Sequence, residues 1–183
     1  GAATALLFVL IFRVIGYFTH FIEHQTIALA TLGGLSIGLI ATVYPQTLFF
    51  GEQQIQTVFD TGATLGVAML LAIGVAKMFA ISCTLHSGFR GGFIFPLFYV
   101  GAAIGLAISL GFPQIHPTIA MVCMMAAVNV AITKTPISTT VILSVLSDSA
   151  IVPVIIIASL VSFLLTTELS LIKTQRARTF KEG

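Results

Sequence analysis

Charged side chains are scarce in this sequence, since Asp, Glu, Lys and Arg make up 8% of its 183 residues while 57% are hydrophobic. Ordinary soluble domains carry roughly 25% charged residues, so a soluble fold of this length would lack the polar surface to cover itself. No charged residue occurs between positions 91 and 133 or between 149 and 167, and a spanning helix needs only about 20 apolar residues. The sequence therefore predicts an integral membrane protein whose longer uncharged run folds back on itself.

Cysteine is almost absent, and the two cysteines, Cys83 and Cys123, both lie inside apolar segments. Two isolated cysteines provide neither a disulfide framework nor the spacing of a metal site. We therefore expect no disulfide, no metal and no cofactor. The sequence also lacks a basic leader before its first apolar run and begins with glycine rather than methionine, so no signal peptide is predicted and we expect the chain to continue upstream.

The few basic residues are concentrated at the end of the sequence, at Lys173, Arg176, Arg178 and Lys181. Basic residues directly after a membrane span mark the cytoplasmic side, which predicts a cytoplasmic C-terminus. Four basic residues beside a span do not predict a nucleic-acid partner.

Apolar runs alternate with glycine, proline and polar clusters along the whole sequence. This pattern predicts an all-α polytopic membrane protein with discontinuous, tilted helices. Residues 52–60 are polar and predict a short interfacial turn, and Asp148 is expected to cap the helix that follows it. Short, interrupted helices are typical of secondary transporters. The predicted helices cover residues 2–21, 26–44, 61–85, 92–110, 118–132, 137–146 and 150–165, with a last one from residue 167.

The clearest interruption is the glycine-rich stretch from Leu85 to Pro96, which reads Leu-His-Ser-Gly-Phe-Arg-Gly-Gly-Phe-Ile-Phe-Pro. Non-helical backbone survives at membrane depth only where it is buried in protein or lines a cavity, and the start of a helix offers free N–H groups and a positive dipole end. The N–H groups of Gly92, Phe93 and Ile94 are therefore predicted to converge on an anion. The alternative is that the glycines only permit a tight turn, with Pro96 in the first helical turn.

Residues 87–96, followed by Gly101-Ala-Ala-Ile-Gly105, resemble the ClC chloride channel and transporter family, in which a Ser-Gly-x-x-Gly-Gly-x-Phe-x-Pro type motif precedes a glycine-spaced helix. Residues 134–138, Lys-Thr-Pro-Ile-Ser, are similar to the family's Arg-Ala-Pro-Leu-Thr segment. The resemblance extends over essentially all of residues 1–183. It implies the second half of a ClC-type transmembrane domain of a divergent bacterial branch, with the first half absent from this sequence and no soluble C-terminal domain.

The resemblance implies a function as well as a fold. In this family an anion accepts hydrogen bonds from backbone amides just after the paired glycines, which correspond here to Phe93 and Ile94. The expected activity is chloride transport as a channel or a proton-coupled exchanger, without enzymatic chemistry. The expected setting is the plasma membrane of a bacterium, in contact with lipid, as a homodimer that associates through about Ile137 to Leu165. The family's serine ligand and gating glutamate belong to the first half.

Some positions depart from the family pattern. Phe95 stands where the family often has alanine, and no tyrosine occurs near Leu171 or Ile172, where the family places a hydroxyl ligand. Arg13 and Lys77 lie within apolar runs and are predicted to snorkel or to pair. The candidates for pore-lining or vestibule positions are Ser87, Gly88, Arg90, Gly91, Phe95, Pro96 and Lys134.

Three alternatives remain open at this point. The missing tyrosine leaves room for fluoride or another anion in place of chloride, and also for a membrane assembly subunit that transports nothing. An intramembrane hydrolase would need Ser87 to work with His86 or another histidine, but no Gly-x-Ser-Gly elbow occurs in the sequence.

Overall fold

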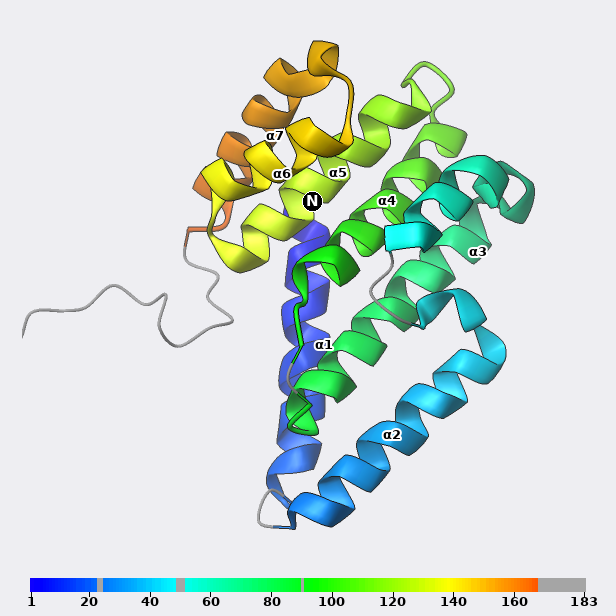
Figure 1. Cartoon of the computed structure of the whole chain (residues 1–183), viewed down its shortest axis with the longest axis vertical. Helices are drawn as coiled ribbons and strands as arrows, with labels where there is room; N and C mark the ends of the chain where they lie inside the picture. The colour runs from blue at the N-terminus through cyan, green and yellow to red at the C-terminus, as the bar shows by residue number, and fades with distance from the viewer. Residues whose placement is uncertain (23–24, 49–51, 90, 168–183) are drawn as a thin grey trace, which may run out of the picture.

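The computed structural model describes residues 1–22, 25–48, 52–89 and 91–167, and these residues form a helical protein (Figure 1). The predicted helices are present, mostly with bounds within two residues of those expected, because long apolar runs and their Gly and Pro interruptions determine them. The main helices are α1 (Ala2–His20), α2 (Thr26–Val43), α3 (Glu52–His86), α4 (Ile94–Gly111), α5 (Pro117–Thr133), α6 (Pro136–Leu146) and α7 (Val152–Leu165), and two short 3-10 helices are η1 (Pro45–Thr47) and η2 (Ser149–Ile151).

Four helices are long and apolar enough to cross a membrane, namely Ala2–His20, Thr26–Val43, Thr64–His86 and Ile94–Gly111. The remaining apolar helices, α5, α6 and α7 with η2, are shorter. Short and long helices together confirm the prediction of an all-α polytopic membrane protein. The predicted last helix, from residue 167, lies outside the described residues apart from Thr167 itself.

Helix α3 differs from the prediction in where the chain changes direction. The polarity of the sequence placed a boundary after Asp60, but the helix continues to Gly66, whose φ of 78° and ψ of 165° are non-helical. Figure 1 shows the segments before and after this point running in different directions. Polarity indicates where a chain meets water, whereas a bend needs a residue that tolerates a positive φ, and glycine does so without a Cβ clash.

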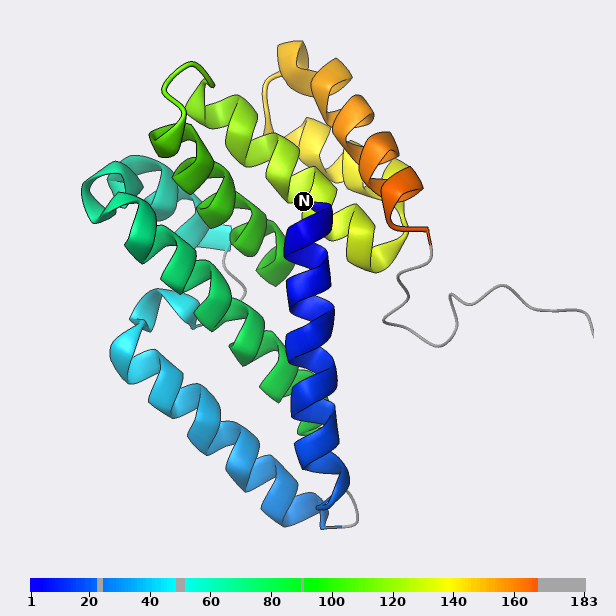
Figure 2. The same cartoon turned by 180° about the vertical axis from the view of Figure 1, so that it is seen from behind.

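Helix α4 forms the centre of the protein and packs between α3 and α5 (Figures 1 and 2). Most of its residues from Pro96 onward are buried. A Cβ placed on Gly101 would lie 2.5 Å from the Cα of Met125, and one on Gly105 would lie 2.6 Å from the carbonyl oxygen of Ala120. The two glycines therefore let the backbones of α4 and α5 touch, which is how helices associate in membranes.

Helices α6 and α7 lie together at one side of the protein and are joined to α5 by polar contacts. The Ser162 hydroxyl donates to the Ala127 carbonyl at 2.6 Å. Asp148 caps η2 as predicted, since its Oδ1 accepts from the Ala150 amide at 3.1 Å. The outer face of the pair is apolar and uncovered, with Ile137 79% exposed and Val145 80% exposed.

Candidate functional site

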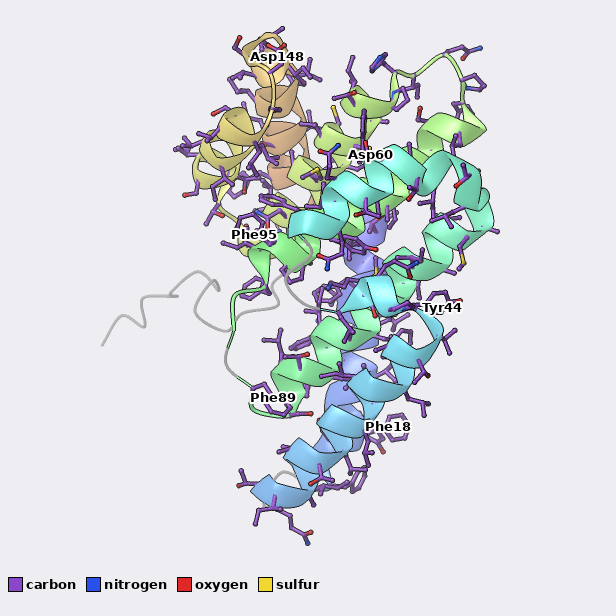
Figure 3. All side chains as sticks on the ribbon, turned by 45° about the vertical axis from the view of Figure 1, so that its right-hand side comes forward. Phe18, Tyr44, Asp60, Phe89, Phe95 and Asp148 are labelled. Atoms are coloured by element: carbon purple, nitrogen blue, oxygen red, sulfur yellow. The ribbon has the colours of Figure 1, made fainter. Side chains whose placement is uncertain are left out.

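The glycine break separates the end of α3 from the start of α4. After His86 the chain makes one more turn, in which the Ser87 amide donates to the Cys83 carbonyl at 2.9 Å and Gly88 adopts a φ of 80°. Figure 3 shows Phe89 and Phe95 near the two ends of the break. The paired glycines thus carry the chain from one helix end to the next without a helical hydrogen-bond ladder.

At the start of α4, the amides of Phe93 and Ile94 have no hydrogen-bond acceptor among the residues that the structure describes. Phe93 is the N-cap residue, with φ of −108° and ψ of 0°, and no side chain caps it among the described residues. Its carbonyl accepts from the Leu97 amide at 3.0 Å, so the amides of Phe93 and Ile94 precede the first intrahelical donor of α4. These groups carry the positive end of the helix dipole, equivalent to roughly half an elementary charge.

A cavity of about 230 Å³ opens at this helix start. A water molecule occupies about 30 Å³ in the liquid, so the cavity has room for a small anion with part of its hydration. Predicted site residues Gly91, Gly92, Phe93 and Pro96 contribute to its wall, opposite residues of α2, η1 and α3. The other lining residues are Ile37, Thr47, Leu48, Lys77, Ala80, Ile81, Thr84 and Leu85.

Among the described lining residues Lys77 carries a charged side chain, and it was not among the residues that the sequence assigned to the site. It does not snorkel, because it is only 2% exposed. Its Nζ donates to the Thr47 carbonyl at 2.6 Å and lies 5.3 Å from the centre of the Tyr99 ring. The sequence did contain a sign that Lys77 faces this cavity. Positions 77, 80, 81 and 84 are spaced so that they share one helix face, and that face leads to the break.

Other predicted residues lie away from this cavity. Ser87 is buried against α2, where a Cβ on Gly33 would overlap its hydroxyl oxygen. Phe95 lines a separate cavity of about 210 Å³ together with Phe59 and other residues of α3, α5 and α6. Gly88 is exposed, with no neighbour close to the position of a Cβ. Arg90 lies outside the described residues.

Lys134 ends α5 rather than facing the start of α4. It adopts the left-handed conformation with a φ of 59°. Its Nζ donates to the Thr166 carbonyl and, at 2.8 Å, to the Thr166 hydroxyl. A cation suits the carbonyl end of a helix, so this side chain fastens the end of α7 to the turn between α5 and α6.

His86 and Arg13 line a third cavity, of about 390 Å³, between α1, α2 and the end of α3. The His86 ring lies 4.1 Å from the Phe12 ring, and its Nδ1 donates to the Ser82 carbonyl at 2.9 Å, since a carbonyl only accepts. Ser87 contributes instead to a neighbouring cavity with Gly33. This arrangement does not bring the pair together as a nucleophile and its base.

The geometry defines a class: a polytopic helical membrane protein in which the residues at the start of a helix, after a glycine-rich break, line a cavity together with a lysine. Comparison with known proteins agrees with this class. Residues 1–167 match the family described as "Voltage gated chloride channel". The chain belongs to this family, whose motifs the glycine break resembles.

Relatives of the chain occur in Salmonella newport, Salmonella agona and Salmonella typhimurium, and each carries the name "Putative ion-transport protein YfeO". Each is 29% identical to this chain over 147 residues, which covers 79% of this chain but 36% of the relative. The matched part is thus little more than a third of the relatives' length.

Proposed function

We propose that this chain is part of an anion transporter, in which the amides of Phe93 and Ile94, with Gly92, hold a chloride ion at the start of α4. The single observation that carries the proposal is the cavity at the start of α4, whose wall includes Gly92, Phe93 and Lys77. Membership of the voltage-gated chloride channel family and the ion-transport name of the relatives support it.

The mechanism needs binding without covalent chemistry, so we propose no enzymatic activity. An anion that enters the cavity loses water and gains fixed N–H dipoles and a nearby ammonium charge. Conduction requires a site strong enough to admit the ion and weak enough to release it. Backbone donors suit this requirement because their direction is set by the helix and costs no side-chain ordering.

We further propose that residues 1–183 correspond to the second half of the transmembrane domain, so that a gating glutamate and a serine ligand would come from another part of the protein. Channel and proton-coupled exchanger differ in those groups. Fluoride is the second candidate ion, since the residues near Leu171 provide no tyrosine hydroxyl. We place the protein in a bacterial plasma membrane with a cytoplasmic C-terminus.

Flux through liposomes tests the proposed function. The protein, purified in its full cellular length, is reconstituted in vesicles loaded with chloride or fluoride, and efflux is followed with an ion-selective electrode while a pH dye reports proton movement. We expect anion efflux that exceeds the flux of potassium by at least about 100-fold. Proton movement against its gradient would identify an exchanger. Vesicles that release neither anion faster than protein-free vesicles would contradict transport and favour an assembly subunit.

A second copy of the chain is the proposed partner of the outer face of α6 and α7. Leu164 and Leu165 on this face are 72% and 71% exposed. The face also contains a hollow of about 240 Å³ lined mainly by apolar groups of both helices, including Val141 and Leu160. A side chain from a facing protein fills a hollow of this kind more closely than disordered lipid tails do. Close packing of this sort is what drives helix association in membranes.

Val141→Trp is expected to convert the proposed dimer into a monomer in mild detergent, because the indole would occupy the hollow and hold the two faces apart. Mass photometry or light scattering coupled to size exclusion measures the change. Val141→Ile keeps the apolar surface and should remain dimeric. A wild-type protein that is monomeric and stable in the same detergent would contradict the proposed association.

A further inference from the structure

We propose that the end of α1 binds an anionic phospholipid, whose phosphate pairs with Arg13 while one of its acyl chains lies between α1 and α2. The inference does not depend on the proposed anion transport, since it concerns two other cavities. Its basis is a charged side chain inside a candidate span, in the wall of one cavity that adjoins a second, apolar cavity.

The first step concerns the charge of Arg13. This residue belongs to the candidate span Ala2–His20 and is exposed on the surface of α1. Its guanidinium forms no hydrogen bond or ion pair with the residues that the structure describes. A guanidinium at membrane depth is costly unless it pairs with an anion or reaches the headgroups. Arg13 therefore needs an anion that the described residues do not supply.

The second step places this end of α1 at the membrane surface. Tyr17, Phe18 and Phe21 are 66%, 66% and 72% exposed, and the Tyr17 ring meets the other two edge-on, with centroids 6.0 Å and 5.5 Å apart. Aromatic side chains, tyrosine in particular, gather where a span meets the headgroups. Tyr17 lies about one helical turn beyond Arg13, or roughly 6 Å along the axis. Lipid phosphates are therefore within reach of Arg13.

The third step is the chemistry of the cavity that contains Arg13, which has a volume of about 390 Å³. None of the described residues that line it is acidic, and the Tyr17 hydroxyl lies in its wall as a further possible donor. A guanidinium matches a phosphate with two parallel N–H donors. The lining residues are Arg13, Gly16, Tyr17, Thr19, His20, Leu29 and His86.

The fourth step is the second cavity, of about 280 Å³, which distinguishes a lipid from free phosphate. Thr19 and Leu29 line both cavities, so the two adjoin there. Figures 1 and 2 show α1 and α2 meeting at this end of the protein and diverging from it. The wall is mainly apolar, with Ile15, Phe18, Ile22 and Leu32, and the Thr19 hydroxyl is already used by the Ile15 carbonyl at 3.0 Å. A phosphate site beside an apolar slot suits a molecule with a head and a tail.

The charge of Arg13 also selects among phospholipids. Phosphatidylethanolamine carries its own ammonium group, which balances its phosphate, whereas phosphatidylglycerol has a net negative charge. Basic residues near the membrane surface attract anionic lipids, and basic pockets between spans bind their headgroups. We therefore assign the site to an anionic lipid of the phosphatidylglycerol kind.

Native mass spectrometry tests this assignment, because it counts the lipids that stay bound to a protein. The full-length protein in mild detergent receives equal amounts of phosphatidylglycerol and phosphatidylethanolamine. We expect the wild type to retain the first about fivefold better, roughly the contribution of one basic residue near an anionic surface. Arg13→Gln should lose this preference, and Arg13→Lys should keep it. Equal retention by the wild type, or an unchanged preference in Arg13→Gln, would overturn the proposal.

The tail of the lipid is tested on α2. Leu32 lines the apolar cavity, and Leu32→Trp should lower retention of both lipids at least about fourfold, the factor for one buried methylene group. Leu35, which is 64% exposed and lies outside the cavity wall, gives the matched control Leu35→Trp, which should bind as the wild type. An excess of sodium phosphate should not displace phosphatidylglycerol. Displacement would show a site for free phosphate and contradict the lipid.

A measurement on the unchanged protein removes any dependence on how the variants fold. Cryo-electron microscopy of the full-length protein in nanodiscs of phosphatidylglycerol should show a lipid phosphate about 3 Å from the Arg13 guanidinium, with an acyl chain continuing past Leu29 toward Leu32. A carboxylate of the protein at Arg13 in place of the phosphate, or an acyl chain absent from the apolar cavity, would overturn the inference.

Discussion

Phe93→Pro is expected to lower anion flux at least about tenfold, because it deletes one of the amide donors at the start of α4. A hydrogen bond to a charged group contributes about 1.5–3 kcal/mol, and every 1.4 kcal/mol corresponds to about a factor of ten in an equilibrium constant. Efflux of chloride from vesicles at several concentrations measures the loss, which should be greatest at low chloride.

The fold should tolerate this change. Phe93 has a φ of −108°, so proline needs only a moderate rotation toward its preferred value near −65°. The Phe93 carbonyl, which accepts from the Leu97 amide, is retained. Gly92 precedes the new proline and has the conformational freedom to adopt the extended backbone that proline demands of its neighbour.

Two control variants separate the amide from other effects. Phe93→Ala removes the ring but keeps the N–H group, and it should retain most of the flux. Thr26→Pro places a proline at the first residue of α2 (Thr26–Val43), where the missing N–H is harmless, and it should behave as the wild type. Equal flux in Phe93→Pro and Phe93→Ala would contradict binding by this amide.

Gly101→Ala is expected to destabilise the protein by about 1–3 kcal/mol, the usual cost of overpacking a well-packed core. Its new Cβ would lie 2.5 Å from the Cα and 2.6 Å from the nitrogen of Met125. Both are backbone atoms, so no side chain can turn aside, and α4 and α5 must move apart. The expected result is a lower midpoint of thermal unfolding. The height of the size-exclusion peak after heating to a series of temperatures measures this midpoint.

Gly111→Ala is the matched control on the same helix. No atom lies within 4 Å of the position that its Cβ would take, and alanine favours the helix by up to about 1 kcal/mol over glycine. The midpoint should stay unchanged or rise. A Gly101→Ala protein as stable as Gly111→Ala would show that α4 and α5 are not in backbone contact.

The sequence alone predicted the elements well because apolar runs and their interruptions are local properties. The break before α4 was predicted from its glycines. Pro96 was predicted to lie in the first turn of the following helix, and it does so in α4. The bend of α3 was misplaced because Gly66 lies several residues beyond Asp60, the last charged residue before the apolar run, where the pattern of polarity no longer changes sharply. The backbone conformation there depends on packing that the one-dimensional pattern does not contain.

The candidate site was predicted only on its amide side. The wall that contains Lys77 depends on a contact between positions 30 residues apart, in which the lysine reaches the Thr47 carbonyl. Helix periodicity places Lys77 on a face, but it does not say which loop covers that face. The role of Lys134 at the end of α7 was missed for the same reason, since Thr166 lies 32 residues away along the chain.

Helix α2 contacts the glycine break where Ser87 packs against Gly33. Gly33 is the single buried residue of α2 (Thr26–Val43), and the serine hydroxyl occupies the space of its missing side chain. A rotation of α2 about its own axis would bring a bulkier neighbour of Gly33 against that hydroxyl and displace the first residue of the break. A partner that binds the outer surface of α2 and rotates this helix would therefore also move Ser87 at the start of the glycine break.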